Sequence, residues 1–176
     1  VGIGSLRSKL LEKFKEYKPS VIRGNASEII ALSGLWKLTG ENRSNVRGVD
    51  STDSVISAKT AAVALARCTG GVAAVSGETD LITDGEIIAY SHGGSHFLGK
   101  ITGAGCSLGG VTGVYLSSST PFIAALTAAQ IYNLAGERAH LKSTGPGGFQ
   151  VRFLDELYNA AAEDVADNSF ELEEVL

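Results

Sequence analysis

Apolar residues recur at a helical spacing in several stretches of the chain. Residues 5–17 place four large apolar side chains on one face and lysines on the other, which predicts an amphipathic helix that ends before Pro19. The alanine-rich stretch at about 53–68 predicts a packed helix. Further helices are predicted after Asn25, from about Gly105, from Pro121 to about 142, and from Phe149 to about 163.

Short apolar runs between these helices predict β-strands. Residues 21–23 and 72–75 predict two buried strands. Residues 81–90 carry Asp84-Gly85 at their centre, which predicts a hairpin closed by a type I′ turn. Helices alternating with buried strands predict an α/β layer fold with a mostly parallel central sheet. Two parallel strands are too few for such a sheet, so we expect more strands upstream of the first helix or from a partner chain.

Composition limits the domain organisation and the class of partner. The chain has 176 residues, 44% of them hydrophobic, which is enough for one sizeable core. We expect one domain over residues 1–165 and a loosely ordered acidic tail over residues 166–176. The net charge is −4 and basic residues are scattered, so we expect no nucleic-acid partner. No apolar run approaches the roughly 18 residues of a membrane span, so we expect no membrane partner.

The cysteines and histidines form no recognisable metal or disulfide pattern. Cys68 and Cys106 are too few for a disulfide framework, and no His/Cys cluster has zinc spacing. This usage fits a reducing, cytoplasmic location. Cys68 lies on an alanine-rich helix face, which predicts a core residue. The histidines have no motif partners, and we expect surface or core positions for His92, His96 and His140.

The sequence Gly103-Ala-Gly-Cys106 stands at the start of a predicted helix. Backbone N–H groups converge at such a turn beside the positive end of the helix dipole, which predicts an anion site at Gly103, Ala104 and Gly105. Cys106 would lie in the first turn of that helix, where the same field favours a thiolate. From position alone, a small buried apolar role for this cysteine is an equal alternative.

A second polar cluster directly follows the first buried strand. Open α/β sheets bind ligands at the carboxyl ends of their strands, so Arg23 and Glu28 are placed to meet phosphate and metal. Asn25 and Glu28 also have the spacing of a capping box, and capping and metal binding are compatible. Ser76 follows the second buried strand in the same way, with an ordinary turn as the alternative.

Residues 94–100 match the beginning of a Walker A loop. Ile101 then stands where the motif requires a magnesium-binding Ser or Thr, and no helix is predicted to begin at Lys100. We therefore expect no P-loop here.

Taken together, these motifs resemble the hydroxyethylthiazole kinase family of the ribokinase-like superfamily. Five segments carry the resemblance, namely residues 19–29, 48–51, 75–85, 101–106 and 145–149. The resemblance extends to about residue 163. It implies a three-layer α/β sandwich, of which we expect this chain to be the C-terminal portion. It further implies transfer of the ATP γ-phosphoryl group to the hydroxyl of 4-methyl-5-(2-hydroxyethyl)thiazole, with Mg²⁺, in thiamine synthesis.

The resemblance also assigns roles to residues around the nucleotide. Arg23 matches the family's ATP-contacting arginine, and Ser76 stands where the family commonly has an ATP-contacting threonine. Glu28, within the Asn-x-x-Glu pattern that starts at Asn25, matches the magnesium-handling element, with contact through water or phosphate. Gly103 matches a glycine at the thiazole-alcohol site.

Cys106 occupies the position at which most ribokinase-like enzymes have a catalytic aspartate. The resemblance therefore implies that it contacts the substrate hydroxyl. We expect Cys106 to act more by positioning the hydroxyl and neutralising charge than by abstracting a proton. Catalysis of phosphoryl transfer depends mainly on stabilising the charge on the transferring group.

The resemblance leaves several alternatives for the whole protein. The family forms trimers with active sites at subunit interfaces, so we expect a homo-oligomer. We expect the family's N-terminal segment, which carries part of the thiazole pocket, to be absent here. An inactive nucleotide-binding or assembly module is therefore an alternative. A related hydroxymethylpyrimidine or sugar kinase is a further alternative. In fungi such a domain is the kinase half of a bifunctional thiamine-phosphate synthase, which is possible for this chain too.

Overall fold

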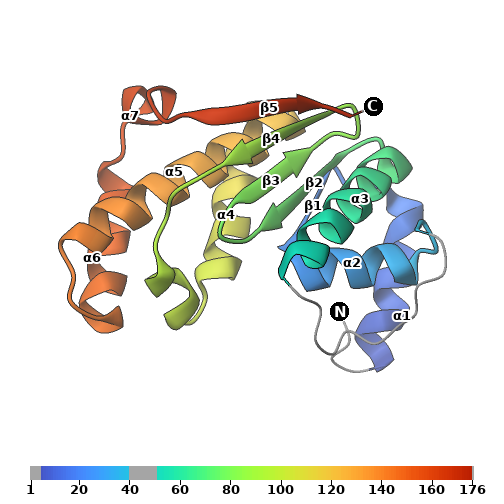
Figure 1. The fold of residues 1–176 in the computed structure, drawn as a ribbon, viewed down its shortest axis with the longest axis horizontal. Helices are drawn as coiled ribbons and strands as arrows, with labels where there is room; N and C mark the ends of the chain where they lie inside the picture. Colours follow the sequence, from blue (N-terminus) through green and yellow to red (C-terminus); the bar gives the residue numbers. More distant parts are fainter. Residues whose placement is uncertain (1–4, 40–50, 176) are drawn as a thin grey trace. The chain divides into compact units, whose positions relative to one another are not determined.

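A computed structural model describes residues 5–39 and 51–175. Its elements, in chain order, are α1 (Ser5–Phe14), η1 (Lys15–Tyr17), β1 (Val21–Asn25), α2 (Ala26–Leu35), α3 (Ser51–Thr69), β2 (Val72–Ser76), β3 (Asp80–Thr83), β4 (Ile87–Ser91), η2 (His96–Lys100), α4 (Ala104–Leu116), α5 (Pro121–Leu141), α6 (Pro146–Asn159), α7 (Ala162–Ala166) and β5 (Phe170–Glu174). Figure 1 shows these elements along the chain. The predicted alternation of helices and strands is confirmed.

The chain divides into two compact units. Among the described residues, the first unit comprises residues 5–39, 51–77, 81–89 and 172–175, and the second comprises residues 78–80 and 90–171. In the first unit α2 and α3 pack together, and α3 also packs on β2. Its fully buried side chains include Ile29 and Leu65. One domain over residues 1–165 stays a prediction.

The five strands form one sheet in the order β1-β2-β3-β4-β5. β1 and β2 are parallel, with Asn25 paired to Ser76. β2 and β3 are antiparallel, because the chain turns back after Ser76 without a crossover helix. The prediction of a mostly parallel sheet is therefore wrong for the described strands, whose pairings are mixed.

The core of the second unit lies between α4, α5 and α6. It is built from buried apolar residues of these helices, namely Leu108, Ala128, Tyr132, Ala135, Ala139, Phe149 and Phe153. The rings of Phe149 and Phe153 are stacked with centroids 5.7 Å apart, one helical turn apart on α6. The small alanines of α5 let the neighbouring helices approach closely.

Two predicted boundaries differ from the structure at the C-terminal end. α6 begins at Pro146, not at Phe149, because proline fits the first position of a helix, where no N–H bond is lost. That helix ends at Asn159. The predicted loose tail instead contains β5, and directly after this strand the Val175 N–H donates to the Glu86 carbonyl at 2.7 Å. An ion pair of 2.7 Å between Lys59 and Glu173 also holds this segment.

The hairpin of β3 and β4 is confirmed, but its predicted turn type is wrong. A type I′ turn needs positive φ at both central residues. In the described loop 84–86, φ is positive at Gly85 (+99°) and not at Asp84. Asp84 instead accepts the N–H groups of Glu86 and Ile87 at 2.9 and 3.0 Å, because its short carboxylate can close the loop locally.

Candidate functional site

The carboxyl ends of β1 and β2 bring two predicted site residues together. The parallel register pairs Arg23 with Ala74 and Asn25 with Ser76. The Arg23 side chain reaches the neighbouring strand, where its Nη2 donates a hydrogen bond of 2.5 Å to the Ser76 Oγ. A guanidinium and a hydroxyl at this edge are the groups that bind phosphate oxygens in open α/β sheets.

Asn25 and Glu28 form the predicted capping box at the start of α2. The Asn25 Oδ1 accepts from the Glu28 N–H at 2.9 Å, and the Glu28 Oε2 accepts from the Asn25 N–H at 2.8 Å. The Asn25 Oδ1 also accepts from the Ser27 hydroxyl at 2.8 Å, so both of its lone pairs are used. Within the described residues, the Glu28 Oε1 makes no hydrogen bond. Because this carboxylate oxygen is not used by the capping box, Glu28 is a better candidate than Asn25 for contact with a cation.

Gly24 makes room for this carboxylate. A Cβ at Gly24 would lie 3.1 Å from both the Cβ and the Oε2 of Glu28. That separation is tighter than ordinary van der Waals contact. The glycine therefore allows the Glu28 side chain to fold back over the strand and reach the Asn25 N–H.

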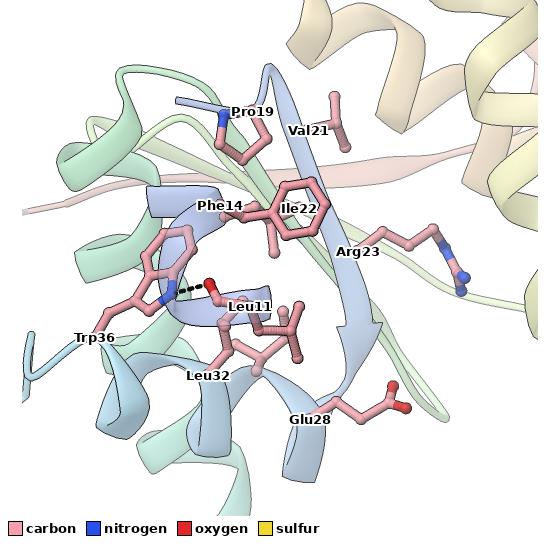
Figure 2. A pocket seen from close by; sticks show the side chains of 10 residues that line it. Leu11, Phe14, Pro19, Val21, Ile22, Arg23, Glu28, Leu32 and Trp36 are labelled. Carbon is pink, nitrogen blue, oxygen red and sulfur yellow. Dashed lines mark hydrogen bonds between the residues drawn. The ribbon is translucent and has the colours of Figure 1, made fainter. Parts of the chain in front are cut away.

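An apolar groove of about 400 Å³ lies beside this cluster in the first unit. Its apolar walls come from α1, β1, α2 and the residues next to them, namely Leu11, Phe14, Pro19, Val21, Ile22, Ile29, Leu32 and Trp36. Figure 2 shows this groove from close by. The Trp36 indole N–H donates to the Leu11 carbonyl at 2.8 Å and ties α1 to α2. The head groups of Arg23 and Glu28 extend away from the apolar walls in Figure 2. The groove was not predicted from the sequence, because it depends on how α1 packs.

The second unit carries the predicted anion turn and the cysteine. Gly103 has φ +89° and stands directly before the first helical residue, Ala104, as predicted. Cys106 lies in the first turn of α4 and is exposed. The alternative of a small buried residue is therefore wrong for Cys106. A thiol in this position is accessible to a substrate.

The remaining sequence predictions have mixed outcomes. Residues 96–100 form the short 3₁₀ helix η2, which is not the helix of a P-loop, so that prediction is confirmed. Cys68 is half-buried, so its prediction as a core residue is wrong. Among the histidines, His92 lies 3.1 Å from the Thr79 hydroxyl and His140 lies 3.0 Å from that of Ser95.

Tyr132 contacts the predicted anion turn and was not predicted from the sequence. Its hydroxyl lies 2.6 Å from the Ala104 carbonyl and 2.6 Å from the Ser107 Oγ. Tyr132 and Ala104 are 28 positions apart in the chain, so no local pattern could have indicated this contact.

No group of three or more His, Cys, Asp or Glu side chains in the described part of the chain could hold a metal ion. A magnesium ion bound through one carboxylate and substrate phosphates needs no such group, so Glu28 fits that kind of site. Among the same residues, no helix has the length and apolar character to cross a bilayer.

Comparison with solved structures places this fold among ribokinase-like α/β kinases. A hydroxyethylthiazole kinase protein from Pyrococcus horikoshii OT3 superimposes with a TM-score of 0.81 at 25% sequence identity, covering 100% of this chain and 63% of that one. The sequence matches the hydroxyethylthiazole kinase family over residues 1–163. The chain belongs to the hydroxyethylthiazole kinase family.

Curated relatives with the name hydroxyethylthiazole kinase match nearly the whole chain. The protein from Bifidobacterium longum (strain DJO10A) is 48% identical over 95% of this chain and 59% of its own length. The protein from Brachyspira hyodysenteriae is 44% identical over 95% of this chain and 62% of its own length. The chain thus spans about 60% of the length of these relatives.

Proposed function

We propose that this chain carries out, or forms the main part of, an ATP- and Mg²⁺-dependent phosphorylation of the hydroxyl of hydroxyethylthiazole. The observation that carries the proposal is an exposed Cys106 in the first turn of α4, directly after Gly103, in a chain of this family. The relatives' common name supports the thiazole alcohol over a hydroxymethylpyrimidine as acceptor. Both cysteines are free, which supports action in a reducing cytoplasm.

In this proposal the first unit binds the nucleotide. Arg23 provides the positive charge for the ATP phosphates, and Ser76 holds its guanidinium in place through the 2.5 Å hydrogen bond. The Glu28 carboxylate would hold Mg²⁺ through phosphate or water. When bound, that ion supplies neutralisation of the charge on the phosphates.

Gly103 and Cys106 would act on the acceptor side of the reaction. The N–H groups that follow Gly103 lie at the positive end of α4, where they would stabilise negative charge on the transferring phosphoryl group. The Cys106 thiol orients the substrate hydroxyl towards that group. Phosphoryl transfer depends mostly on position and charge, so a cysteine suffices where many kinases use an aspartate.

A second candidate is a nucleotide-binding or assembly module without turnover. The observation that favours it is the span of the chain, about 60% of the length of the relatives. We propose a homo-oligomer, a trimer or a multiple of it, in which subunits complete one another's active sites. Fusion to a thiamine-phosphate synthase is compatible with either candidate.

Labelled ATP separates these candidates. The chain is incubated with [γ-³²P]ATP, Mg²⁺ and hydroxyethylthiazole, and the products are separated by chromatography. Labelled thiazole phosphate supports the kinase. ATP binding by calorimetry without labelled product supports the module, and label transferred only to a parallel sample of hydroxymethylpyrimidine would contradict the assigned acceptor.

A further inference from the structure

The first turn of α4 lacks a side-chain cap. Its N-cap residue is Gly103, which has no side chain that could accept a hydrogen bond from the first turn. Within the turn, the Ser107 N–H donates to the Gly103 carbonyl at 2.8 Å, and the Ser107 Oγ lies 3.0 Å from the same oxygen. Glycine adopts a φ of +89° without strain but also many other conformations, so Gly103 alone does not fix the geometry of the turn.

A contact from α5 supplies that restraint. The Tyr132 hydroxyl donates to the Ala104 carbonyl at 2.6 Å, and the Ser107 Oγ lies 2.6 Å from the same hydroxyl oxygen. Each hydroxyl carries one proton. The Ser107 hydroxyl lies within hydrogen-bond distance of three acceptors, namely the Tyr132 hydroxyl oxygen and the carbonyls of Gly103 and Ala104. Both hydroxyls therefore contact the carbonyl of the first helical residue.

The Tyr132 ring is itself held firmly. It is 3% exposed and packs edge-on against Phe153, with ring centroids 4.7 Å apart at 71°. Leu108 and Phe149 belong to the same buried cluster. Since protein cores are close-packed, the ring has little freedom, and its hydroxyl is a fixed point on the longest helix of the unit.

The planarity of the peptide group passes this restraint on to the anion turn. The Ala104 carbonyl and the Gly105 N–H belong to one trans peptide plane and point in opposite directions. A hydroxyl that fixes the carbonyl therefore also fixes the direction of that N–H, and Cys106 is the next residue. We infer that Tyr132 is a positioning residue that sets the orientation of the first turn of α4, and with it the anion-binding groups and the Cys106 thiol.

This inference rests on the proposed function only for its link to phosphoryl transfer. The positioning itself is a property of the folded chain and can be tested without turnover. The test variant is Tyr132→Phe, which removes the hydroxyl and keeps the ring. Tyr115→Phe is the matched control, because Tyr115 packs against the same core cluster from α4. Local exchange of backbone amides, followed by NMR, reports on the turn without any need for turnover.

In Tyr132→Phe we expect the amides of Ser107 and Leu108 to exchange about tenfold faster, the factor for one lost hydrogen bond of ordinary strength. Exchange in the middle of α5 and in α6 should stay within about twofold, and Tyr115→Phe should leave the first turn unchanged. Unchanged exchange at Ser107 and Leu108 would overturn the inference. An equal acceleration throughout α4, α5 and α6 would also overturn it, because it would show a role in core stability alone.

Kinetics then distinguish the inference from the proposed function. If the chain phosphorylates the thiazole alcohol, Tyr132→Phe should lower kcat about tenfold and leave the KM for ATP unchanged, since Arg23 and Ser76 are untouched. Faster local exchange with an unchanged kcat would support the positioning role and contradict the part of the proposed function that assigns phosphoryl stabilisation to this turn. A raised KM with an unchanged kcat would contradict the link to transfer.

Discussion

The guanidinium of Arg23 and the hydroxyl of Ser76 are joined by a hydrogen bond of 2.5 Å. The two residues are 53 positions apart in the chain. They meet because β1 and β2 run parallel in register, so their carboxyl ends share one edge of the sheet. This contact links Arg23, for which we propose phosphate binding by charge, to a hydroxyl that orients its guanidinium.

Removal of the Ser76 hydroxyl should therefore weaken ATP binding. In Ser76→Ala we expect the Kd for Mg·ATP to rise about tenfold, because the guanidinium loses one of the hydrogen bonds that orient it. Ser76→Thr keeps the hydroxyl and should bind ATP within about threefold of the wild type. Isothermal titration calorimetry measures both, and equal affinity of the alanine variant and the wild type would contradict this role.

Asn25 and Glu28 can be separated into a capping role and a metal role. Asn25→Ala should lower the free energy of unfolding by about 1 kcal/mol, because α2 loses its N-cap. Glu28→Gln keeps an acceptor oxygen for the Asn25 N–H and should unfold at nearly the wild-type urea concentration. It removes the carboxylate, so ATP binding should lose its dependence on Mg²⁺. A Glu28→Gln variant that binds ATP with wild-type magnesium dependence would rule out the metal role.

The ion pair between Arg138 and Asp164 predicts a pH dependence of stability. A hydrogen bond from Arg138 and one from the Ala161 N–H lower the pKa of Asp164 to about 2. A carboxyl with a lowered folded pKa stabilises the protein above its unfolded pKa, about 4, and this contribution is lost as the pH falls through about 2. Asp164→Asn should therefore be less stable than the wild type at pH 7, with a difference that shrinks between about pH 4 and pH 2.

Thermal unfolding of both proteins from pH 7 to pH 2 tests this pH dependence. Glu163→Gln is the control, because it removes a neighbouring exposed carboxylate of the same helix, α7. A difference between wild type and Asp164→Asn that is the same at pH 7 and pH 2 would be incompatible with an ionised Asp164 as its source.

Two glycines should respond in opposite ways to alanine. Gly85 has φ +99°, and a Cβ there would lie 2.7 Å from the Arg67 Cγ, so Gly85→Ala should lower the free energy of unfolding by about 1–3 kcal/mol. Gly34 lies in α2 with no atom within 4 Å of an added Cβ, so Gly34→Ala should raise it by up to about 1 kcal/mol. Urea unfolding curves measure both, and equal stability of the two variants would contradict the assigned strain.

The sequence predicted features that depend on neighbours in the chain. The capping box needs Asn25 and Glu28 three residues apart, and the helix after Gly103 needs a glycine turn before an apolar run. Both follow from backbone hydrogen bonding within a few residues. The position of Cys106 in a first helical turn was predictable for the same reason. Its exposure was not, because burial depends on what packs against α4.

Features that depend on contacts between distant segments escaped prediction. The Tyr132 hydroxyl reaches Ala104 across 28 residues through the packing of α5 on α4. The segment that forms β5 was predicted to be a loosely ordered tail, because its glutamates indicated exposure to solvent. Its alternation of Phe170 and Leu172 with acidic residues has the period of a strand, yet it forms one only because the edge of β4 is available.

Product formation by the wild type and by Cys106→Ala tests the central claim most directly, with Cys68→Ala as the matched cysteine control. We expect wild type and Cys68→Ala to form thiazole phosphate from ATP and hydroxyethylthiazole, and Cys106→Ala to turn over about 10²–10⁴ times more slowly, the usual effect of losing a group that acts on the reacting hydroxyl. Because Cys106 is exposed, all three proteins should unfold at similar temperatures. A Cys106→Ala variant with wild-type kcat, or a wild type that binds ATP and forms no thiazole phosphate, would contradict the account.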